Sequence, residues 1–258
     1  MALAVLAVVG IGFTSCGDDG DGGTSGGGSG TFQGAKKVYG NTLPSEFSSS
    51  SETTKFSYDT NGFLTKIENT NSSGTKTATL SYVGNKINVV YTSRSGKVTQ
   101  IIATIGSNGF ASKAEYIGSG EVETYEFEYN SDGQMSKAKW GEEGDEVVYD
   151  FAYSNGDIDH VSIYQNGSLY RTNTYTYSSY NNIGYADTHY FVSSIDVIGE
   201  ILSYAGALGR PNKHLLSSAV SGSSTRAYEW QLNSAGYPIQ QTYTHYSTTI
   251  TTIKYTTL

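Results

Sequence analysis

The chain has 258 residues and a formal charge of −8, so it gives no electrostatic reason to expect a nucleic acid or an anionic membrane surface as a partner. Its 22 Tyr, 9 Phe and 31 Gly, against only 3 Pro, favour aromatic strands separated by glycine turns. A single Cys excludes an internal disulfide and any metal site built from several cysteines.

The chain starts with an apolar segment. Residues 2–13 are all apolar or Gly, which is the length of the hydrophobic part of a signal peptide and too short for a membrane-spanning helix. Thr14 and Ser15 then lead into Cys16. This Phe-Thr-Ser-Cys run resembles a bacterial lipobox. The resemblance implies that residues 1–15 are a lipoprotein signal peptide and that Cys16 carries the lipid that anchors the protein to a membrane. The alternative is a small, buried free cysteine.

Residues 16–30 continue as a Gly/Ser tract that cannot bury apolar area, so we expect a flexible tether. Asp18, Asp19 and Asp21 follow Cys16 closely. Such acidic residues resemble the surface-export signal of lipoproteins in the Gram-negative phylum rich in gut anaerobes. The resemblance implies an outer-membrane lipoprotein exposed at the cell surface. A charged, hydrated spacer is the plainer alternative.

From residue 56 onward, glycines of the kind found in tight turns recur every 10 to 13 residues. That interval fits one strand plus one turn, and a turn with positive φ favours Gly. The glycines are Gly62, Gly74, Gly84, Gly96, Gly109, Gly120, Gly133, Gly144, Gly156 and Gly167.

A fuller unit recurs in residues 56–68, 127–140 and 151–164, and it reads aromatic-x-Tyr, turn, Gly, strand. A fixed period of this kind indicates a repetitive architecture. In one such strand, Tyr125 and Phe127 share a face opposite Glu126, which predicts a sheet that is buried on one side.

The units resemble YD repeats of the Rhs and teneurin type, most plainly in residues 58–65, Tyr-Asp-Thr-Asn-Gly-Phe-Leu-Thr. The resemblance implies a long antiparallel sheet, which in the larger proteins curls into a hollow shell. Asn130 and Ser154 stand where the first unit has Asp59, so the likeness is to the scaffold.

The strand pattern ends after Tyr177. Residues 194–208 place Ile195, Ile198, Ile201 and Leu202 at helical spacing, and this pattern predicts one amphipathic helix. We expect three strands to follow it, near residues 225–232, 237–246 and 248–256.

Residues 209–243 are similar to the C-terminal part of a family of gut-bacterial (Bacteroidetes-type) lipoproteins of unknown function. The fold of that family is described as porin-like, and the resemblance implies a fold and a location without an activity.

The chain carries no recognisable catalytic apparatus. Its four histidines, His160, His189, His214 and His245, lack metal-ligand spacing, and no nucleophile elbow, Walker loop or dinucleotide fingerprint is present. His160 occupies the unit position that Lys66 fills elsewhere, which indicates a hydrated position. We therefore expect a protein that is not an enzyme and uses no metal or other cofactor.

Exposed aromatic rings on a rigid sheet can stack on sugars or apolar ligands. Trp140 and Trp230 are the speculative ligand-binding candidates, although packing inside the sheet explains most aromatic residues equally well.

Together these patterns predict an all-β fold for residues 31–258, an antiparallel up-and-down meander of about 13 or 14 strands. The sheet closes into a barrel or curls strongly, and the helix near 194–208 fills its centre. A membrane-spanning barrel is less favoured because the turns are short and the aromatic face is interrupted.

Three functions remain open. The first is a cell-surface module for binding or adhesion, with glycan as a candidate ligand. The second is a carrier of a lipid or other apolar ligand inside the barrel. The third is a purely structural envelope component. An exposed aromatic patch favours the first, an enclosed apolar cavity the second.

Overall fold

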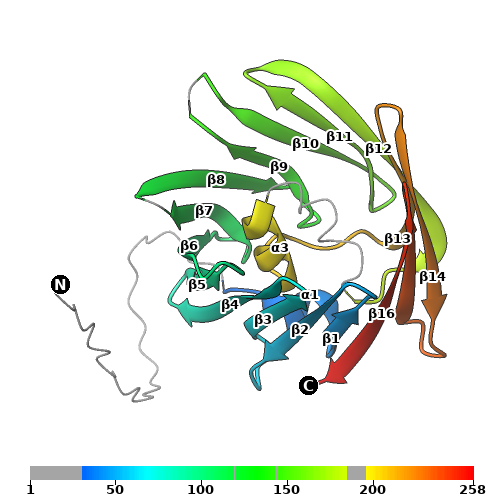
Figure 1. The fold of residues 1–258 in the computed structure, drawn as a ribbon. Helices are drawn as coiled ribbons and strands as arrows, with labels where there is room; N and C mark the ends of the chain where they lie inside the picture. Colours follow the sequence, from blue (N-terminus) through cyan, green and yellow to red (C-terminus); the bar gives the residue numbers. More distant parts are fainter. Residues whose placement is uncertain (1–30, 119, 143, 185–195) are drawn as a thin grey trace, which may run out of the picture.

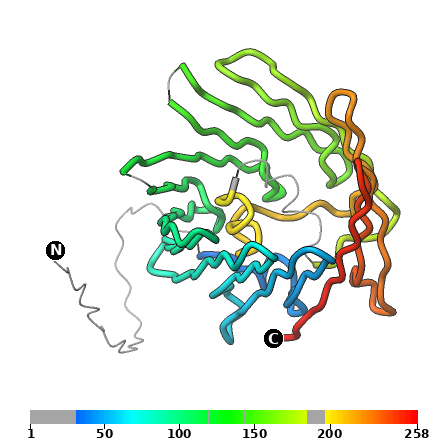
Figure 2. The backbone as a smooth tube through the Cα atoms, in the orientation of Figure 1, coloured from blue at the N-terminus to red at the C-terminus, as the bar shows by residue number. Residues whose placement is uncertain are grey.

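The computed structural model describes residues 31–118, 120–142, 144–184 and 196–258. In them, 16 antiparallel strands form a closed barrel in which each strand pairs with its neighbours in the sequence. The barrel closes where β1 pairs with β16, with Thr42 opposite Thr257. Figure 2 shows the chain running once around the barrel, so that its first and last strands lie side by side. The predicted all-β meander is confirmed.

The strands run along the chain as follows: β1 Thr42–Ser48, β2 Glu52–Tyr58, β3 Leu64–Asn71, β4 Gly74–Val83, β5 Lys86–Thr92, β6 Val98–Ile105, β7 Ala111–Gly118, β8 Glu121–Tyr129, β9 Met135–Trp140, β10 Val147–Ser154, β11 Asp157–Gln165, β12 Ser168–Asn181, β13 His214–Ser221, β14 Ser224–Leu232, β15 Pro238–Thr244 and β16 Thr248–Thr257.

The strands outnumber the 13 or 14 that were predicted. After the helix, four strands follow instead of three, because β13 (His214–Ser221) contains small polar residues and lacks the aromatic alternation of its neighbours. Strand β1 lies ahead of the glycine repeat and contains Pro44, which argues against a strand. The barrel tolerates Pro44 because the pairing with β16 shifts by one residue at this point.

All ten predicted turn glycines have positive φ. The turn chemistry also explains why Asn replaces Asp in later units. Asp59 Oδ1 accepts hydrogen bonds from the backbone N–H groups of Asn61 and Phe63, both at 2.9 Å. Asn130 Oδ1 accepts the equivalent pair from Asp132 and Gln134, both at 3.0 Å. An amide oxygen serves the turn as well as a carboxylate does.

Helix α3 (Asp196–Tyr204) lies inside the ring of strands (Figure 1) and ends before the predicted residue 208. Ile195, the first residue of its predicted apolar face, lies outside the described residues. Ile198 and Leu202 are fully buried, which confirms that the helix fills the barrel. Glu200 forms an ion pair with Lys76 of β4 at 3.6 Å, so the helix is also tied to the wall. None of the helices in the described residues is long and apolar enough to cross a bilayer.

A second helix, α1 (Gly34–Tyr39), was not predicted. It has 6 residues, fewer than two turns, which is too short to show a periodic pattern. Its Tyr39 hydroxyl donates a hydrogen bond of 2.7 Å to the backbone carbonyl of Ser203, which joins the two helices.

One end of the barrel is covered by chain segments, and we call it the plugged end. Backbone hydrogen bonds attach Gln33 to Gly109 at 3.2 Å and Ala207 to Ala111 at 2.8 Å. The backbone N–H of Arg210 donates another hydrogen bond, of 2.8 Å, to the carbonyl of Gly133.

The turns at the plugged end are 59–63, 84–85, 106–110, 130–134, 155–156 and 233–237. The opposite end, the hairpin rim, carries the turns 49–51, 72–73, 93–97, 166–167, 222–223 and 245–247.

Candidate functional site

The inner face of the barrel is apolar and aromatic. Alternate residues of each strand point inward, and the buried ones among them surround α3. The Phe56 ring lies 4.6 Å from the Tyr204 ring, centroid to centroid, where the wall meets the helix. The interior is therefore a packed core in this part of the barrel.

The outer face carries ion pairs in the middle of the strands. Lys113 and Glu115 on β7 lie 2.8 Å apart, and this hydrogen bond lowers the pKa of the Glu115 carboxyl. Lys137 on β9 lies 3.8 Å from Asp150 on β10. Further outward pairs join Lys66 to Glu68 at 2.9 Å and Lys254 to Glu46 at 2.7 Å. Charged side chains thus occupy the face that a membrane-spanning barrel would present to lipid.

Both predicted ligand-binding tryptophans are half-buried and pack against the core. The Trp140 ring stacks between Tyr125 and Tyr149, with centroids 5.9 Å and 5.0 Å away. Trp230 donates a hydrogen bond of 2.7 Å from Nε1 to the Leu216 carbonyl. Neither ring therefore belongs to an outward-facing patch, and Trp230 already has a structural partner.

Trp140 belongs to a larger set of inward aromatic rings, which we call the aromatic wall. Its members lie on β8–β10 and on β14–β15, and the rings of Tyr228 and Tyr243 contact each other there with centroids 5.4 Å apart. The set comprises Tyr125, Phe127, Trp140, Tyr149, Phe151, Tyr228 and Tyr243. Most of these rings are buried, and the half-buried Trp140 and Tyr243 keep surface that a ligand can contact.

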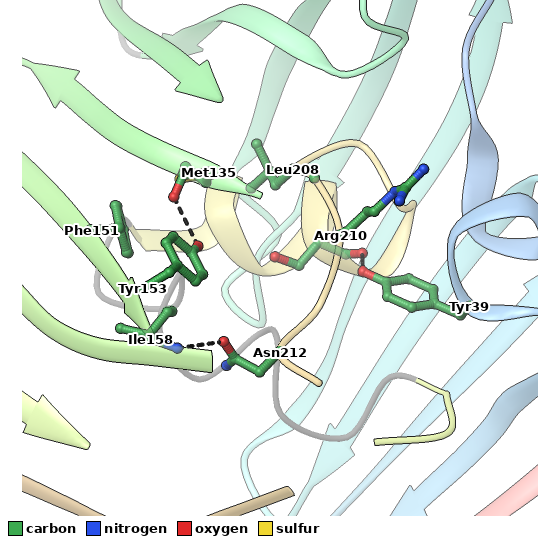
Figure 3. A pocket seen from close by; sticks show the side chains of 10 residues that line it. Tyr39, Met135, Phe151, Tyr153, Ile158, Leu208, Arg210 and Asn212 are labelled. Atoms are coloured by element: carbon green, nitrogen blue, oxygen red, sulfur yellow. Dashed lines mark hydrogen bonds between the residues drawn. The ribbon is translucent and has the colours of Figure 1, made fainter. Parts of the chain in front are cut away.

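An interior pocket lies between the end of α3 and strands β9–β11 (Figure 3). It has a volume of about 30 Å³, which is room for one water molecule. Ser203 at its edge is only 1% exposed, and its Oγ makes no hydrogen bond within the described part of the chain. A buried hydroxyl without a partner is costly, so this pocket is suited to a polar atom that completes it.

Two other polar side chains of this pocket form hydrogen bonds. The Tyr153 hydroxyl donates to the Met135 carbonyl at 2.8 Å, and Asn212 Oδ1 accepts from the Ile158 N–H at 3.1 Å (Figure 3). Burial raises the pKa of Tyr153 far above its ordinary value near 10, so this hydroxyl keeps its proton and acts as a donor. It is not suited to general-base chemistry at neutral pH.

The described histidines have structural partners. His160 is 40% exposed, close to the 42% of Lys66 at the equivalent unit position, and it contacts Asp159 at 2.8 Å. His214 Nδ1 lies 2.7 Å from Asp157 Oδ2, and the same carboxylate accepts from the His214 backbone N–H at 2.8 Å. His245 pairs with Ser224 at 2.5 Å. Across the residues that the structure describes, no cluster of His, Cys, Asp and Glu could hold a metal ion.

Some predicted residues lie outside the described part of the chain, namely His189, Cys16 and the rest of the export segment and tether. Conversely, the sequence did not predict the pocket residues Tyr39, Ser203 and Asn212. They come from α1, α3 and the segment before β13, and no spacing in the sequence signals that these three elements meet.

Comparison with known proteins agrees with this architecture. Residues 79–252 match the family model described as a domain of unknown function (DUF4595) with porin-like fold. A search of curated proteins found no match.

Two solved structures are similar in fold. A porin-like protein from Bacteroides uniformis is 18% identical, with a TM-score of 0.66, and the match covers 83% of this chain and 96% of that one. A porin-like protein from Bacteroides vulgatus is 12% identical, with a TM-score of 0.56, covering 84% of this chain and 100% of that one.

Proposed function

We propose that this chain, which belongs to the family of domains of unknown function with porin-like fold (DUF4595), is a non-catalytic envelope lipoprotein. The barrel fold is compatible with a location in the cell envelope, and in this proposal the barrel binds an apolar or ring-bearing small molecule.

The observation that carries this proposal is the orientation of the two faces. Aromatic rings line the inside of the barrel, and Lys–Glu and Lys–Asp pairs lie outside. A barrel that spans a bilayer needs the reverse, an apolar outer band about 25 Å tall and a polar interior. The arrangement favours a barrel that is surrounded by water and holds its ligand inside. The term porin-like then describes the arrangement of its strands and not a position within the bilayer.

Anchoring is the second part of the proposal, and it rests on the lipobox-like residues that end at Cys16. The described chain begins beside the plugged end, where Gln33 bonds to Gly109. The tether that the sequence predicts for residues 16–30 would have a root-mean-square length of about 20 Å. It would hold the plugged end toward the membrane and leave the hairpin rim facing away.

A second candidate function is adhesion through the hairpin rim, with a glycan as a candidate ligand. Tyr170 follows the β11–β12 turn and is 62% exposed. Tyr246 lies in the β15–β16 turn and is 92% exposed. Exposed tyrosines at a rim that faces away from the anchor are available for stacking on sugar rings.

Native mass spectrometry of the detergent-extracted chain tests the first proposal, because a bound molecule adds its mass. We expect an adduct in the wild type that is lost in Trp140→Ala together with Tyr149→Ala, and retained in the control Tyr246→Ala. Absence of an adduct in the wild type would contradict the ligand-container proposal. Adhesion through the hairpin rim would be supported if, in addition, the wild type binds a glycan array and Tyr246→Ala is the one variant that loses this binding.

A further inference from the structure

Strand β12 presents a cation, an amide and an aromatic ring to the inside of the barrel, at Arg171, Asn173 and Tyr175. The strand register shows this direction, because directly opposed residues of a sheet share a face. Each of the three lies opposite a buried core residue of a neighbouring strand: Arg171 opposite Ile163, Asn173 opposite Val161 and Tyr175 opposite Ala219. We call the three inward residues the β12 row.

The β12 row lies on the side of the barrel that faces the wall to which α3 is tied. Glu200 of the helix pairs with Lys76 of β4 at 3.6 Å, and half of the ring of 16 strands separates β4 from β12. Arg171 is exposed, and Asn173 and Tyr175 are half-buried, although the residues that they oppose are buried. Water therefore reaches this stretch of the inner face, close to the hairpin-rim turn 166–167.

Arg171 supplies a positive charge that the described chain does not neutralise. None of the ion pairs among the described residues involves it. Its guanidinium carbon lies 5.7 Å from the centroid of the Tyr170 ring, and an aromatic face attracts a guanidinium without removing its charge. Because a guanidinium can bind both oxygens of a carboxylate at once, Arg171 is complementary to a carboxylate ligand.

Asn173 supplies a hydrogen-bond acceptor that has no donor. Its Oδ1 is buried and accepts no hydrogen bond within the described part of the chain. A buried acceptor of this kind is costly until a donor reaches it, and a ligand hydroxyl is such a donor. Residues two apart on a strand lie about 7 Å from each other, so one sugar ring can carry a carboxylate to Arg171 and a hydroxyl to Asn173.

We infer that the β12 row binds an acidic sugar, with its carboxylate at the Arg171 guanidinium and a hydroxyl donating to Asn173 Oδ1. The half-buried ring of Tyr175, the next inward residue, offers a flat surface to the C–H face of the sugar. This inference rests on the proposed ligand-binding function and adds a ligand class and a place to it. Binding forms no covalent bond.

Ligand-observed NMR titration of the detergent-extracted full chain tests the inference with three probes. These are glucuronate, neutral glucose and cyclohexanecarboxylate, an anion on a ring without hydroxyls. We expect glucuronate to bind most tightly. Arg171→Gln should weaken glucuronate about fivefold, as an exposed ion pair allows, and should bring it level with glucose. Asn173→Leu should weaken glucuronate and glucose alike, about fivefold for one lost hydrogen bond, and leave cyclohexanecarboxylate unchanged.

Two matched controls separate the β12 row from general effects. Lys97→Gln removes an exposed cation at another place on the hairpin rim, and Thr174→Val changes an exposed residue on the outer face of the same strand. Both should leave the affinity for glucuronate unchanged. Without a ligand, Asn173→Leu should also keep the unfolding midpoint of the wild type, because no hydrogen bond to Oδ1 is lost.

Affinity for glucuronate that survives both Arg171→Gln and Asn173→Leu would place the ligand elsewhere and overturn this inference, while leaving the barrel as a ligand binder. Glucose that binds as tightly as glucuronate would overturn the role of the charge, and cyclohexanecarboxylate that does so would overturn the sugar class. Absence of binding by all three probes would overturn the site, and only a missing adduct in native mass spectrometry would add the failure of the proposed function.

Discussion

Side chains near the ends of six strands donate hydrogen bonds to a carbonyl at or near the start of the preceding strand, and we call each such bond a latch. The donors and acceptors are Tyr58 to Pro44 (3.0 Å), Tyr82 to Leu64 (2.7 Å), Tyr129 to Ala111 (2.7 Å), Tyr153 to Met135 (2.8 Å), Trp230 to Leu216 (2.7 Å) and Tyr255 to Pro238 (2.8 Å).

Each latch lies where the pairing register shifts. Leu64, for example, pairs with Tyr58 while Lys66 pairs with Ser57, so Thr65 is left over as a bulge. Met135 and Lys137 flank Ser136 in the same way against β8. A bulge disturbs the ladder and leaves a carbonyl in need of a donor. The inward aromatic side chain supplies that donor, which explains why the repeat unit ends its strand with Tyr.

Removal of one latch hydroxyl should destabilise the barrel. Tyr153→Phe keeps the ring but leaves the Met135 carbonyl without its donor, so we expect a loss of about 1–3 kcal/mol in the free energy of unfolding. Chemical denaturation measures this loss. Tyr164→Phe on the outer face is the control and should change it by less than about 0.5 kcal/mol. Equal effects of the two substitutions would mean that the latch is not stabilising.

The latches also predict a sensitivity to high pH. Burial raises the pKa of Tyr58, Tyr82, Tyr129, Tyr153 and Tyr255 in the folded chain. The unfolded chain loses these protons near pH 10, so their stabilisation is complete below that pH and falls as the pH rises above it. Circular dichroism should show the unfolding midpoint falling from about pH 10 upward. Independent titration of these tyrosines near pH 10 in a folded barrel, read by absorbance, would contradict the prediction.

At the scale of single elements, α3 should contribute strongly to stability. Ile198→Ala and Leu202→Ala each empty space at a fully buried position, so each should cost about 2–5 kcal/mol. Ile250→Ala on β16, which is 52% exposed, is the control and should cost less than about 0.5 kcal/mol. Denaturant titrations compare the three. A cost below half a kcal/mol for both helix variants would mean that the helix is peripheral to the core.

Elements with a strong local signal were predictable from the sequence. The turn glycines needed positive φ, and the spacing of Ile198, Ile201 and Leu202 indicated α3 directly. Two elements lacked such a signal. Strand β1 contains Pro44, whose place depends on a bulge against the distant β16. Helix α1 is held by a bond from Tyr39 to Ser203, far along the chain.

The site was harder to predict than the fold for a geometric reason. Alternation along a strand separates two faces, but it does not say which face becomes the inside when the sheet closes. Trp140 and Trp230 were therefore candidates for an exposed surface, whereas their rings pack against the core. The pocket beside α3 needs segments from separate parts of the chain.

At the scale of the whole molecule, the inner and outer faces determine how the barrel can relate to a membrane. Outward ion pairs occur on β3, β7 and across β9–β10, so the charged face extends around a large part of the circumference. Placing such groups in hydrocarbon costs about 2–4 kcal/mol for each Lys near the bilayer midplane. A lipid on Cys16 would then be the sole attachment to the membrane.

This reasoning predicts the outcome of removing the anchor. In Cys16→Ala, expressed with an ordinary cleavable secretory signal in place of residues 1–15, no acyl chain is added, and the charged outer face gives the barrel no reason to enter the bilayer. We expect the variant in the aqueous fraction of lysed cells, while the wild type sediments with membranes and is released by detergent. Cys16→Ala that still sediments after a high-salt wash would show a direct contact between barrel and lipid, and the container model would then give way to a membrane-embedded barrel.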